Sequence, residues 1–323
     1  MTDIVHHTVD ANGIKIHYAE AGVGPLIILC HGFPESWYSW RHQLSALAEA
    51  GYRAVAPDMR GYGHTDRPQE VEKYTILHLV GDMVGLLDAL GGGQAVIAGH
   101  DWGAPVAWNS ALLRPDRFRA VIGLSVPFIP RRPLRPTSTM PQTDDALFYQ
   151  LYFQPEGQAE AEFERDPDAT LRTLLYASSG DAPPRSAAAP IAMVPRKGGF
   201  LAGRTPPATL PQWLSEADIA YYAGEFARTG FRGGLNWYRN IDRSWELMAP
   251  FAGLQVKVPA LYVAGDRDLV VAFPGMDKLI PNLSMFVPSL RKTIMLPGCG
   301  HWTQQERAPE VNAAMIDFLR SLD

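Results

Sequence analysis

Apolar residues along this chain recur in two alternating patterns. One is helical spacing, as at Leu77, Val80 and Val84. The other is a short run that is mostly or wholly apolar, which occurs at positions 26–30, 52–56, 95–98, 120–124, 260–264 and 293–296. Continuous apolar strands that alternate with helices are typical of a parallel sheet buried on both faces. The pattern therefore predicts an α/β architecture, with a mostly parallel central sheet flanked by helices.

The two ends of the chain add to this picture. Residues 4–9 and 14–19 alternate apolar and polar side chains around Asn12-Gly13, which predicts an antiparallel hairpin at the edge of the sheet. Towards the other end, the pattern predicts a helix near 274–280 and a final helix with Val311 and Met315 on its apolar face.

The pattern of parallel strands is interrupted between residues 128 and 245. Helical pieces occur here at 147–153, 158–164, 169–177 and 216–228. The stretch 180–211 is dense in Pro, Gly and Ala, lacks periodicity and is too long for an ordinary loop. We expect a helical cap at 128–245, with 180–211 wrapped over its surface. It would be inserted between two parts of the sheet domain, at 1–127 and 246–323.

The pentapeptide Gly99-His100-Asp101-Trp102-Gly103 stands between an apolar run and a segment of small residues. A nucleophile between small residues at a strand–turn–helix junction is the nucleophile elbow of α/β-hydrolases, where Ser is usual. A carboxylate that attacks a saturated carbon forms an ester that water can cleave, whereas Ser would form a stable ether. Asp101 therefore indicates an alkyl electrophile, either an epoxide or a carbon–halogen bond. The alternative interpretation is an Asp that caps a helix.

Other strand ends carry polar groups of the expected kinds. Ligands of open α/β sheets bind beyond the carboxyl ends of the strands, where this chain has His31-Gly32-Phe33, then Asp266 with Asp268, and His301. Nucleophile, acid and His follow one another in the α/β-hydrolase order. The spacing does not separate Asp266 from Asp268 as the acid. The backbone N–H groups of Phe33 and Trp102 are the expected oxyanion-hole donors.

Composition and charge exclude several classes of function. The net charge is −5 over 323 residues without a basic face, so no nucleic-acid partner is expected. No apolar run approaches the roughly 18 residues of a membrane span, and the N-terminus lacks the features of a signal peptide. Cys30 and Cys299 lack metal-ligand spacing and favour a reducing compartment, which predicts a cytoplasmic protein. His6-His7 has no third ligand nearby, so no metal is predicted.

Longer motifs resemble those of the soluble epoxide hydrolases of the α/β-hydrolase superfamily, over nearly the whole chain. Four of them lie in the predicted sheet domain: His31-Gly32-Phe33-Pro34-Glu35, Asp58-Met59-Arg60-Gly61-Tyr62-Gly63, Gly99-His100-Asp101-Trp102-Gly103-Ala104 and Gly300-His301-Trp302-Thr303-Gln304. Two more resemble that family's lid-tyrosine segments: Tyr149-Gln150-Leu151-Tyr152-Phe153-Gln154 and Leu235-Asn236-Trp237-Tyr238-Arg239-Asn240. The resemblance implies a single-domain form like the bacterial and plant members, without the N-terminal phosphatase domain of the vertebrate enzymes. Residues 180–211 have no counterpart in these motifs.

The resemblance also implies roles for single residues. Tyr149 and Tyr238 would hold the epoxide oxygen, with Tyr221 and Tyr222 less favoured, and Asp268 rather than Asp266 would orient the catalytic His. A phenol has a pKa near 10, so at neutral pH it can donate a hydrogen bond to that oxygen. We expect the substrate pocket to include His31, Pro34, Trp102 and Trp302.

The predicted reaction is hydrolysis of an epoxide to a vicinal diol through a covalent ester of Asp101, which His301 and water then cleave without a cofactor or metal. The first alternative is a haloalkane or haloacid dehalogenase with the same nucleophile, in which the Trp102 indole would bind the halide. The second is a non-catalytic ligand-binding member of the fold. Two phenols favour the epoxide, because a leaving halide needs no proton. The expected partners are the epoxide and water, in a monomer or homodimer.

Overall fold

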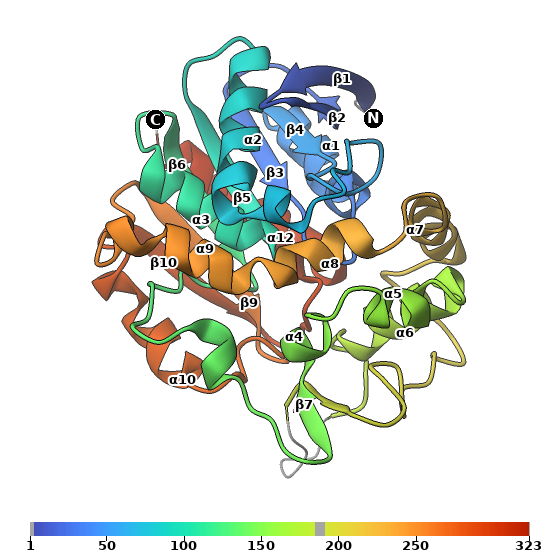
Figure 1. Ribbon diagram of the computed structural model, residues 1–323. Coiled ribbons are helices and arrows are strands. Elements are labelled where there is room, and N and C mark those ends of the chain that lie inside the picture. Colours follow the sequence, from blue (N-terminus) through green and yellow to red (C-terminus); the bar gives the residue numbers. More distant parts are fainter. Residues whose placement is uncertain (1–2, 185–190, 323) are drawn as a thin grey trace.

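The structure is a computed structural model that describes residues 3–184 and 191–322. An eight-stranded sheet runs through it in the order β1-β2-β4-β3-β5-β6-β9-β10 (Figure 1). The hairpin β1–β2 is antiparallel and joins β4 antiparallel, and each following pair is parallel. The strands are β1 (Val5–Ala11), β2 (Ile14–Ala21), β3 (Leu26–Cys30), β4 (Arg53–Pro57), β5 (Ala95–His100), β6 (Phe118–Leu124), β9 (Ala260–Gly265) and β10 (Leu290–Leu296).

Helices cover both faces of this sheet. Ile28 and Cys30 of β3 pack in the core that includes α2 (Ile76–Ala89) and α3 (Gly103–Leu113). The alternate residues Ile27 and Leu29 pack against α1 (Arg41–Glu49) and α12 (Ala308–Arg320) on the other face. Successive side chains of a strand point to opposite faces, so a strand covered on both sides must be apolar throughout. The predicted α/β architecture is confirmed.

The predicted helix near 274–280 is shorter than expected. It is α10 (Met276–Leu279), which gives way to the 3₁₀ segment η5 (Ile280–Met285). Pro281 has no backbone N–H for a helical bond, and Asn282 leaves the helical region with φ −106° and ψ 17°. Among the described residues, no helix is both long enough and apolar enough to cross a membrane.

The described residues between β6 and β9 contribute no strand to the main sheet, and much of this segment lies to one side of that sheet (Figure 1). We propose that 128–245 acts as a cap on a sheet domain made of 1–127 and 246–323. The main elements of the cap are β7 (Ala146–Phe148), α4 (Tyr149–Tyr152), α5 (Gln158–Phe163), α6 (Pro167–Ala177), β8 (Met193–Pro195), α7 (Glu216–Thr229), α8 (Arg232–Arg239) and α9 (Ile241–Leu247).

Two expectations for this segment differ from the structure. The helix predicted at 147–153 begins only at Tyr149, because the preceding residues form β7, which pairs antiparallel with β8. This pairing joins residues far apart in sequence, so local spacing does not reveal it. The stretch 180–211 does not simply wrap the surface either, because Ala192 and Val194 are buried. Its residues 185–190 lie outside the described chain.

We predict opposite effects for two glycine-to-alanine changes. In Gly103→Ala, the new Cβ would overlap the carbonyl oxygen of Cys30, where α3 packs closely against the end of β3. We expect the free energy of unfolding to fall by at least about 2 kcal/mol. In Gly224→Ala, on the exposed side of α7, the new Cβ has no atom within 4 Å. Alanine favours a helix more than glycine does, so the free energy of unfolding should rise by about 0.5–1 kcal/mol. Urea unfolding measures both changes, and equal effects would contradict the close packing inferred at Gly103.

Candidate active site

The turn between β5 and α3 presents Asp101 in a backbone conformation that few residues adopt. Its φ is 49°, in the left-handed region, which Asp tolerates better than most residues but at a cost of order 1–3 kcal/mol. Gly99 and Gly103 flank the turn, and a side chain on either would overlap backbone atoms. The turn aims the Asp101 carboxylate away from the sheet, where Oδ1 accepts the Phe33 N–H at 2.8 Å.

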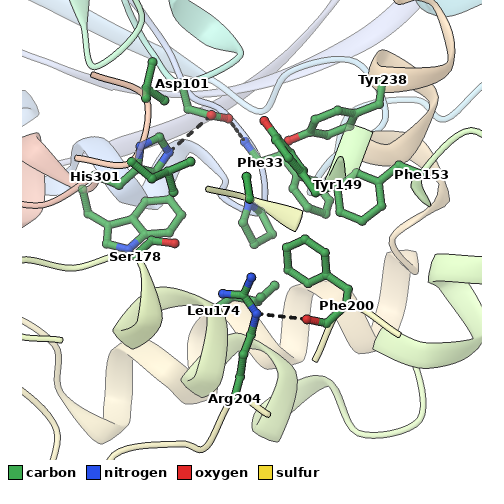
Figure 2. A pocket seen from close by; sticks show the side chains of 15 residues that line it. Phe33, Asp101, Tyr149, Phe153, Leu174, Ser178, Phe200, Arg204, Tyr238 and His301 are labelled. Atoms are coloured by element: carbon green, nitrogen blue, oxygen red, sulfur yellow. Dashed lines mark hydrogen bonds and ion pairs between the residues drawn. The ribbon is translucent and has the colours of Figure 1, made fainter. Parts of the chain in front are cut away.

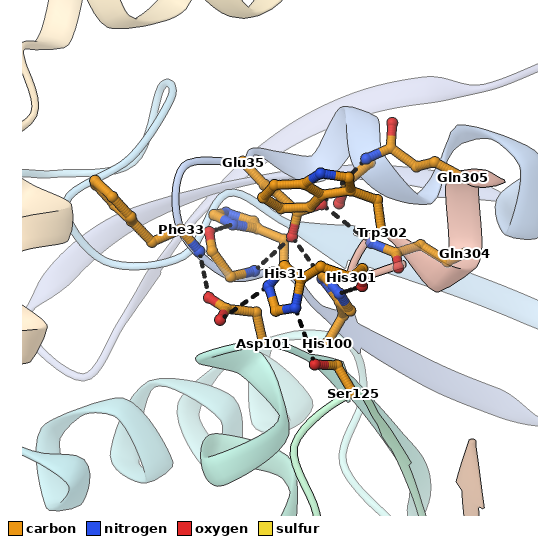
Figure 3. Close-up of polar contacts among 12 residues, drawn as sticks. His31, Phe33, Glu35, His100, Asp101, Ser125, His301, Trp302, Gln304 and Gln305 are labelled. Atoms are coloured by element: carbon orange, nitrogen blue, oxygen red, sulfur yellow. Dashed lines mark hydrogen bonds and ion pairs between the residues drawn. The ribbon is translucent and has the colours of Figure 1, made fainter. Parts of the chain in front are cut away.

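His301 lies between two carboxylates. Its Nε2 is 3.3 Å from Asp101 Oδ2, and its Nδ1 is 2.9 Å from Asp268 Oδ1. The Ser125 hydroxyl is also within 3.1 Å of Nδ1 (Figure 3). Asp266 faces elsewhere, because its Oδ1 accepts the Gly298 N–H in a neighbouring turn. The structure thus brings Asp268, and not Asp266, to the His.

The two catalytic candidates shift each other's protonation. Burial alone would raise the pKa of Asp101, but the hydrogen bond and positive charge of His301, with the Phe33 N–H, lower it below its usual value. Burial alone would lower the pKa of His301, but Asp268 and Asp101 raise it well above 6.5. At neutral pH the resting pair is therefore a carboxylate and an imidazolium.

Two tyrosines from different helices of the proposed cap lie near Asp101. Tyr149 is the first residue of α4 and Tyr238 lies in α8, with ring centroids 5.9 Å apart. Both hydroxyls point toward Asp101 (Figure 2). Burial, and then the charge of Asp101, raise the pKa of each phenol above 10, so both remain protonated donors. Tyr221 instead stacks on Tyr38, with ring centroids 4.1 Å apart, and Tyr222 donates to Gln305.

These groups face one cavity between sheet domain and cap. Besides Asp101, His301, Tyr149 and Tyr238, its walls are largely apolar and comprise Phe33, Pro34, Phe153, Leu174, Ser178, Ala192, Phe200, Arg204, Leu269, Val270 and Trp302.

Of the predicted pocket residues, Pro34 and Trp302 line this cavity, and His31 and Trp102 do not. His31 is fully buried below it, where Nε2 accepts the Met59 N–H at 3.0 Å and Nδ1–H donates to Gly32 O. The Trp102 ring lies against Tyr238, with ring centroids 5.1 Å apart. It therefore supports a pocket residue without forming the wall. The oxyanion role of the Trp102 N–H stays a prediction.

Comparison with known proteins agrees with this geometry. A model of the alpha/beta hydrolase fold family matches residues 25–308. Epoxide hydrolase 3 of Siraitia grosvenorii is 46% identical over 99% of both chains, and epoxide hydrolase A of Mycobacterium tuberculosis is 46% identical over 98% of this chain and 97% of its own. The crystal structure of epoxide hydrolase A from Mycobacterium thermoresistibile has 45% identity, a TM-score of 0.92 and 99% coverage of both chains. This chain belongs to the epoxide hydrolase family.

The enzyme also contains a buried carboxylate whose role local sequence patterns do not indicate. Glu35 is fully buried and accepts four N–H groups: Gly32 N–H (3.1 Å) and His100 Nδ1–H (2.9 Å) at Oε2, and the side-chain amides of Gln304 (3.0 Å) and Gln305 (3.2 Å) at Oε1 (Figure 3). Burial would raise the pKa of Glu35, but His100 outweighs it and lowers the pKa. Glu35 thus joins the loops of Phe33, Asp101 and His301.

The other ring nitrogen of His100 completes this connection. His100 Nε2 lies 2.7 Å from the His301 carbonyl oxygen, and a carbonyl can only accept. Both nitrogens of His100 therefore donate, one to Glu35 and one to the backbone of His301. His100 belongs to the elbow motif, but its link between Glu35 and the His301 carbonyl becomes visible only in the three-dimensional structure.

A second buried carboxylate holds the loop of His301 against the cap. Glu306 accepts the N–H groups of Gly180 (2.8 Å) and Gly300 (2.8 Å) at Oε2 and of Trp302 (3.0 Å) at Oε1. The His301 N–H itself donates to Ser178 O at 2.9 Å. Residues 178–180 are thus bonded directly to the segment that carries His301, a contact that local sequence patterns do not indicate.

We predict that Glu35→Gln weakens this epoxide hydrolase strongly. All four partners of Glu35 donate, so the new amide N–H₂ would face donors and His100 Nδ1–H would lose its carboxylate partner. We expect the free energy of unfolding to fall by about 3–5 kcal/mol, as when a buried ion pair loses one partner. The matched control is Glu246→Gln, at an exposed pair with Arg243, which should leave the urea midpoint unchanged. If Glu35→Gln unfolded at the same urea concentration as the wild type, the fold would not need this carboxylate.

Proposed function

We propose that this enzyme hydrolyses its epoxide in two steps through an ester of Asp101. The proposal rests on the groups that surround the Asp101 carboxylate. Asp101 forms an ion pair with His301, in which Oδ2 and Nε2 are 3.3 Å apart, and it faces two protonated phenols, Tyr149 and Tyr238 (Figure 2). An ionised nucleophile opposite two hydrogen-bond donors suits a three-membered ring whose carbon is attacked while its oxygen gains negative charge.

In the first step, an oxygen of Asp101 attacks a ring carbon and the carbon–oxygen bond of the epoxide breaks. The electron pair of that bond moves to the ring oxygen, which Tyr149 and Tyr238 stabilise and one of them protonates. The product is a hydroxyalkyl ester of Asp101. The phenolate that remains regains its proton from solvent. Both tyrosines come from the proposed cap, which would close over the substrate.

In the second step, water attacks the ester carbonyl of Asp101 and releases the diol. Esterification removes the negative charge of Asp101, so His301 keeps only Asp268 as a close carboxylate and its pKa falls. The imidazolium then releases its proton to solvent. The neutral imidazole takes a proton from the attacking water and passes it to the diol oxygen that leaves when the tetrahedral intermediate collapses. The Phe33 N–H, already 2.8 Å from Oδ1, would stabilise the tetrahedral oxyanion, a contact typically worth about 3 kcal/mol. The Trp102 N–H is the proposed second donor.

The dehalogenase alternative is less well supported. Its halide needs no proton, whereas two phenols face the nucleophile, and the Trp102 ring lies against Tyr238 and not on the cavity wall. A cytoplasmic location and a monomeric or homodimeric state remain predictions from the sequence.

An isotope experiment tests the covalent route. In a single turnover in ¹⁸O-water with excess enzyme and styrene oxide, the label should enter Asp101 and not the diol, because water attacks the carboxyl carbon. His301→Gln should slow the second step and leave the ester on the protein, visible as a mass increase equal to that of the substrate. Asp101→Ala should form neither ester nor diol. Label found directly in the first-turnover diol would refute the covalent route.

The pKa shifts predict different pH profiles for the two steps. Ester formation needs the Asp101 carboxylate, whose lowered pKa keeps it ionised, so its rate should be flat from about pH 5 upward. It should fall only above about pH 10, since both phenols have raised pKa values. Ester hydrolysis needs neutral His301, so its rate should rise with pH through the His301 pKa and then level off. Stopped-flow tryptophan fluorescence separates the steps, and an ester-formation rate that follows the His301 titration would contradict these assignments.

A further inference from the structure

The backbone turns sharply at Ser125, directly after the end of β6. Ser125 has a φ of 68°, in the left-handed region, and the Val126 N–H donates to Leu124 O at 2.8 Å. A bond of this kind around a central residue with positive φ forms the rarer, strained type of γ-turn. Glycine adopts such a backbone at the least cost. A serine that is kept in this conformation beside the site indicates that the site uses its side chain.

The neighbouring strand β9 holds Ser125 in this conformation. The Ser125 N–H donates to Val263 O at 2.9 Å, and the Tyr262 hydroxyl donates to Ser125 O at 2.7 Å. Both partners lie on β9, the strand that leads to Asp268, and Tyr262 and Ser125 are fully buried. A strained backbone persists only where its surroundings fix it. These bonds therefore fix the place of the Ser125 side chain relative to Asp268.

The Ser125 hydroxyl lies beside the ring of His301. Its oxygen is 3.1 Å from His301 Nδ1 (Figure 3), and Asp268 Oδ1 is 2.9 Å from the same nitrogen. A carboxylate can only accept a hydrogen bond, so Nδ1 carries a proton, and the hydroxyl oxygen is a second acceptor within its reach. The Nδ1–H of His301 is thus shared between a carboxylate and a hydroxyl that come from the ends of two strands.

Asp268 by itself holds the imidazole through one oxygen only. Its Oδ1 accepts the Val270 N–H at 2.9 Å as well as the imidazole N–H, and its buried Oδ2 has no hydrogen-bond partner among residues 3–184 and 191–322. A single contact allows a planar ring to pivot about it, whereas two acceptors fix the plane of the ring. The second contact matters most in ester hydrolysis, because His301 Nε2 then faces an ester and no longer the ionised carboxylate of Asp101.

The hydroxyl of Ser125 carries no charge, unlike the acidic groups around His301. The charged or titratable side chains that face His301 come from the elbow, the end of β5, the turn after β9, the cap and α11 (Thr303–Glu306), and they are Asp101, His100, Asp268, Tyr149 and Glu306. A further carboxylate would raise the pKa of His301 and keep the imidazole protonated after the ester has formed. A neutral acceptor orients the ring without this effect.

We propose that Ser125 is a positioning residue for ester hydrolysis. Its hydroxyl shares the Nδ1–H of His301 with Asp268 and keeps Nε2 directed at the water that attacks the ester. This inference rests on the proposed two-step hydrolysis, and it adds a residue that does not line the cavity. Ser125 has no part in the first step, in which Asp101 attacks the epoxide without a base.

The test compares Ser125→Ala and Ser125→Gly with Ser110→Ala. Both changes at Ser125 remove the hydroxyl, and glycine also relieves the backbone strain, so Ser125→Gly should fold at least as readily as Ser125→Ala. Ser110 is the matched control, because it is also fully buried, on α3, and its hydroxyl has no hydrogen-bond partner in the described part of the chain.

Two measurements are made on each variant. Stopped-flow fluorescence with styrene oxide gives the rates of ester formation and ester hydrolysis between about pH 5 and about pH 10. A ¹⁵N NMR titration of the histidines in the resting enzyme, with His301→Gln for assignment, gives the His301 pKa without any turnover.

In both Ser125 variants, the rate of ester hydrolysis should fall about three- to tenfold at its high-pH plateau, because the imidazole spends less time in the productive orientation. The midpoint of its pH profile should move down by about 0.5–1 pH unit, because a charged donor forms the stronger hydrogen bond and the imidazolium therefore loses more than the neutral ring. The His301 pKa measured by NMR should fall in the same direction. Ester formation should be unchanged, and Ser110→Ala should behave as the wild type in every measurement.

An unchanged His301 pKa together with an unchanged profile of ester hydrolysis in both Ser125 variants would overturn the role of Ser125. An equal fall in both rates would also overturn it, because a general loss of packing slows both steps. If the wild type formed no ester from styrene oxide, the proposed function itself would fail, and the NMR titration would still show whether the Ser125 hydroxyl stabilises the imidazolium.

Discussion

The buried carboxylate of Glu35 connects the three segments on which the active site depends. A fully buried carboxylate is costly to remove from water, and it is tolerated only when its oxygens meet enough donors. Glu35 meets four, from the Phe33 loop, from the end of β5 and from the segment after His301. If any one of these segments moved, its N–H donor or a Glu35 oxygen would be left buried without a hydrogen-bond partner. The network therefore fixes Phe33, Asp101 and His301 relative to one another more firmly than apolar packing alone would.

Glu306 extends the same principle from the sheet domain to the cap. It gathers backbone N–H groups from the His301 segment and from Gly180, while His301 N–H donates to Ser178 O. Burial raises the pKa of Glu306, and the three N–H groups oppose that rise. His301 is thus held on one side through the Glu35 network and on the other through Ser178. A displacement of the backbone near Gly180 would therefore shift the position of His301, the proposed base.

Local patterns in the sequence were sufficient for most of the sheet and for the order of the chemical groups. Apolar runs identify strands buried on both faces, and an Asp between glycines identifies the sharp turn. Spacing alone does not distinguish Asp266 from Asp268 as the acid beside His301, because the conformation of the turn after β9 determines which carboxylate lies next to that residue. Local patterns do not predict the β7–β8 pair, because its partners are far apart in sequence. They also do not identify Glu35 and Glu306, because charged residues are usually exposed and the burial of these two depends on donors from distant segments.

The two halves of the cavity are built from different kinds of contact. Around Asp101, His301 and Glu35, directional hydrogen bonds join several segments, and such networks fail when one member changes. Around Phe153, Phe200 and Leu174, the wall consists mainly of ring and methyl contacts, which tolerate changes of shape at modest cost. Substrate range can therefore change through the cap wall while the chemistry at Asp101 stays intact. The turn at Phe200 and Leu201 lies in this second half and has an anchor of its own, because both N–H groups donate to Glu162, so its position does not depend on the hydrogen bonds of Glu35.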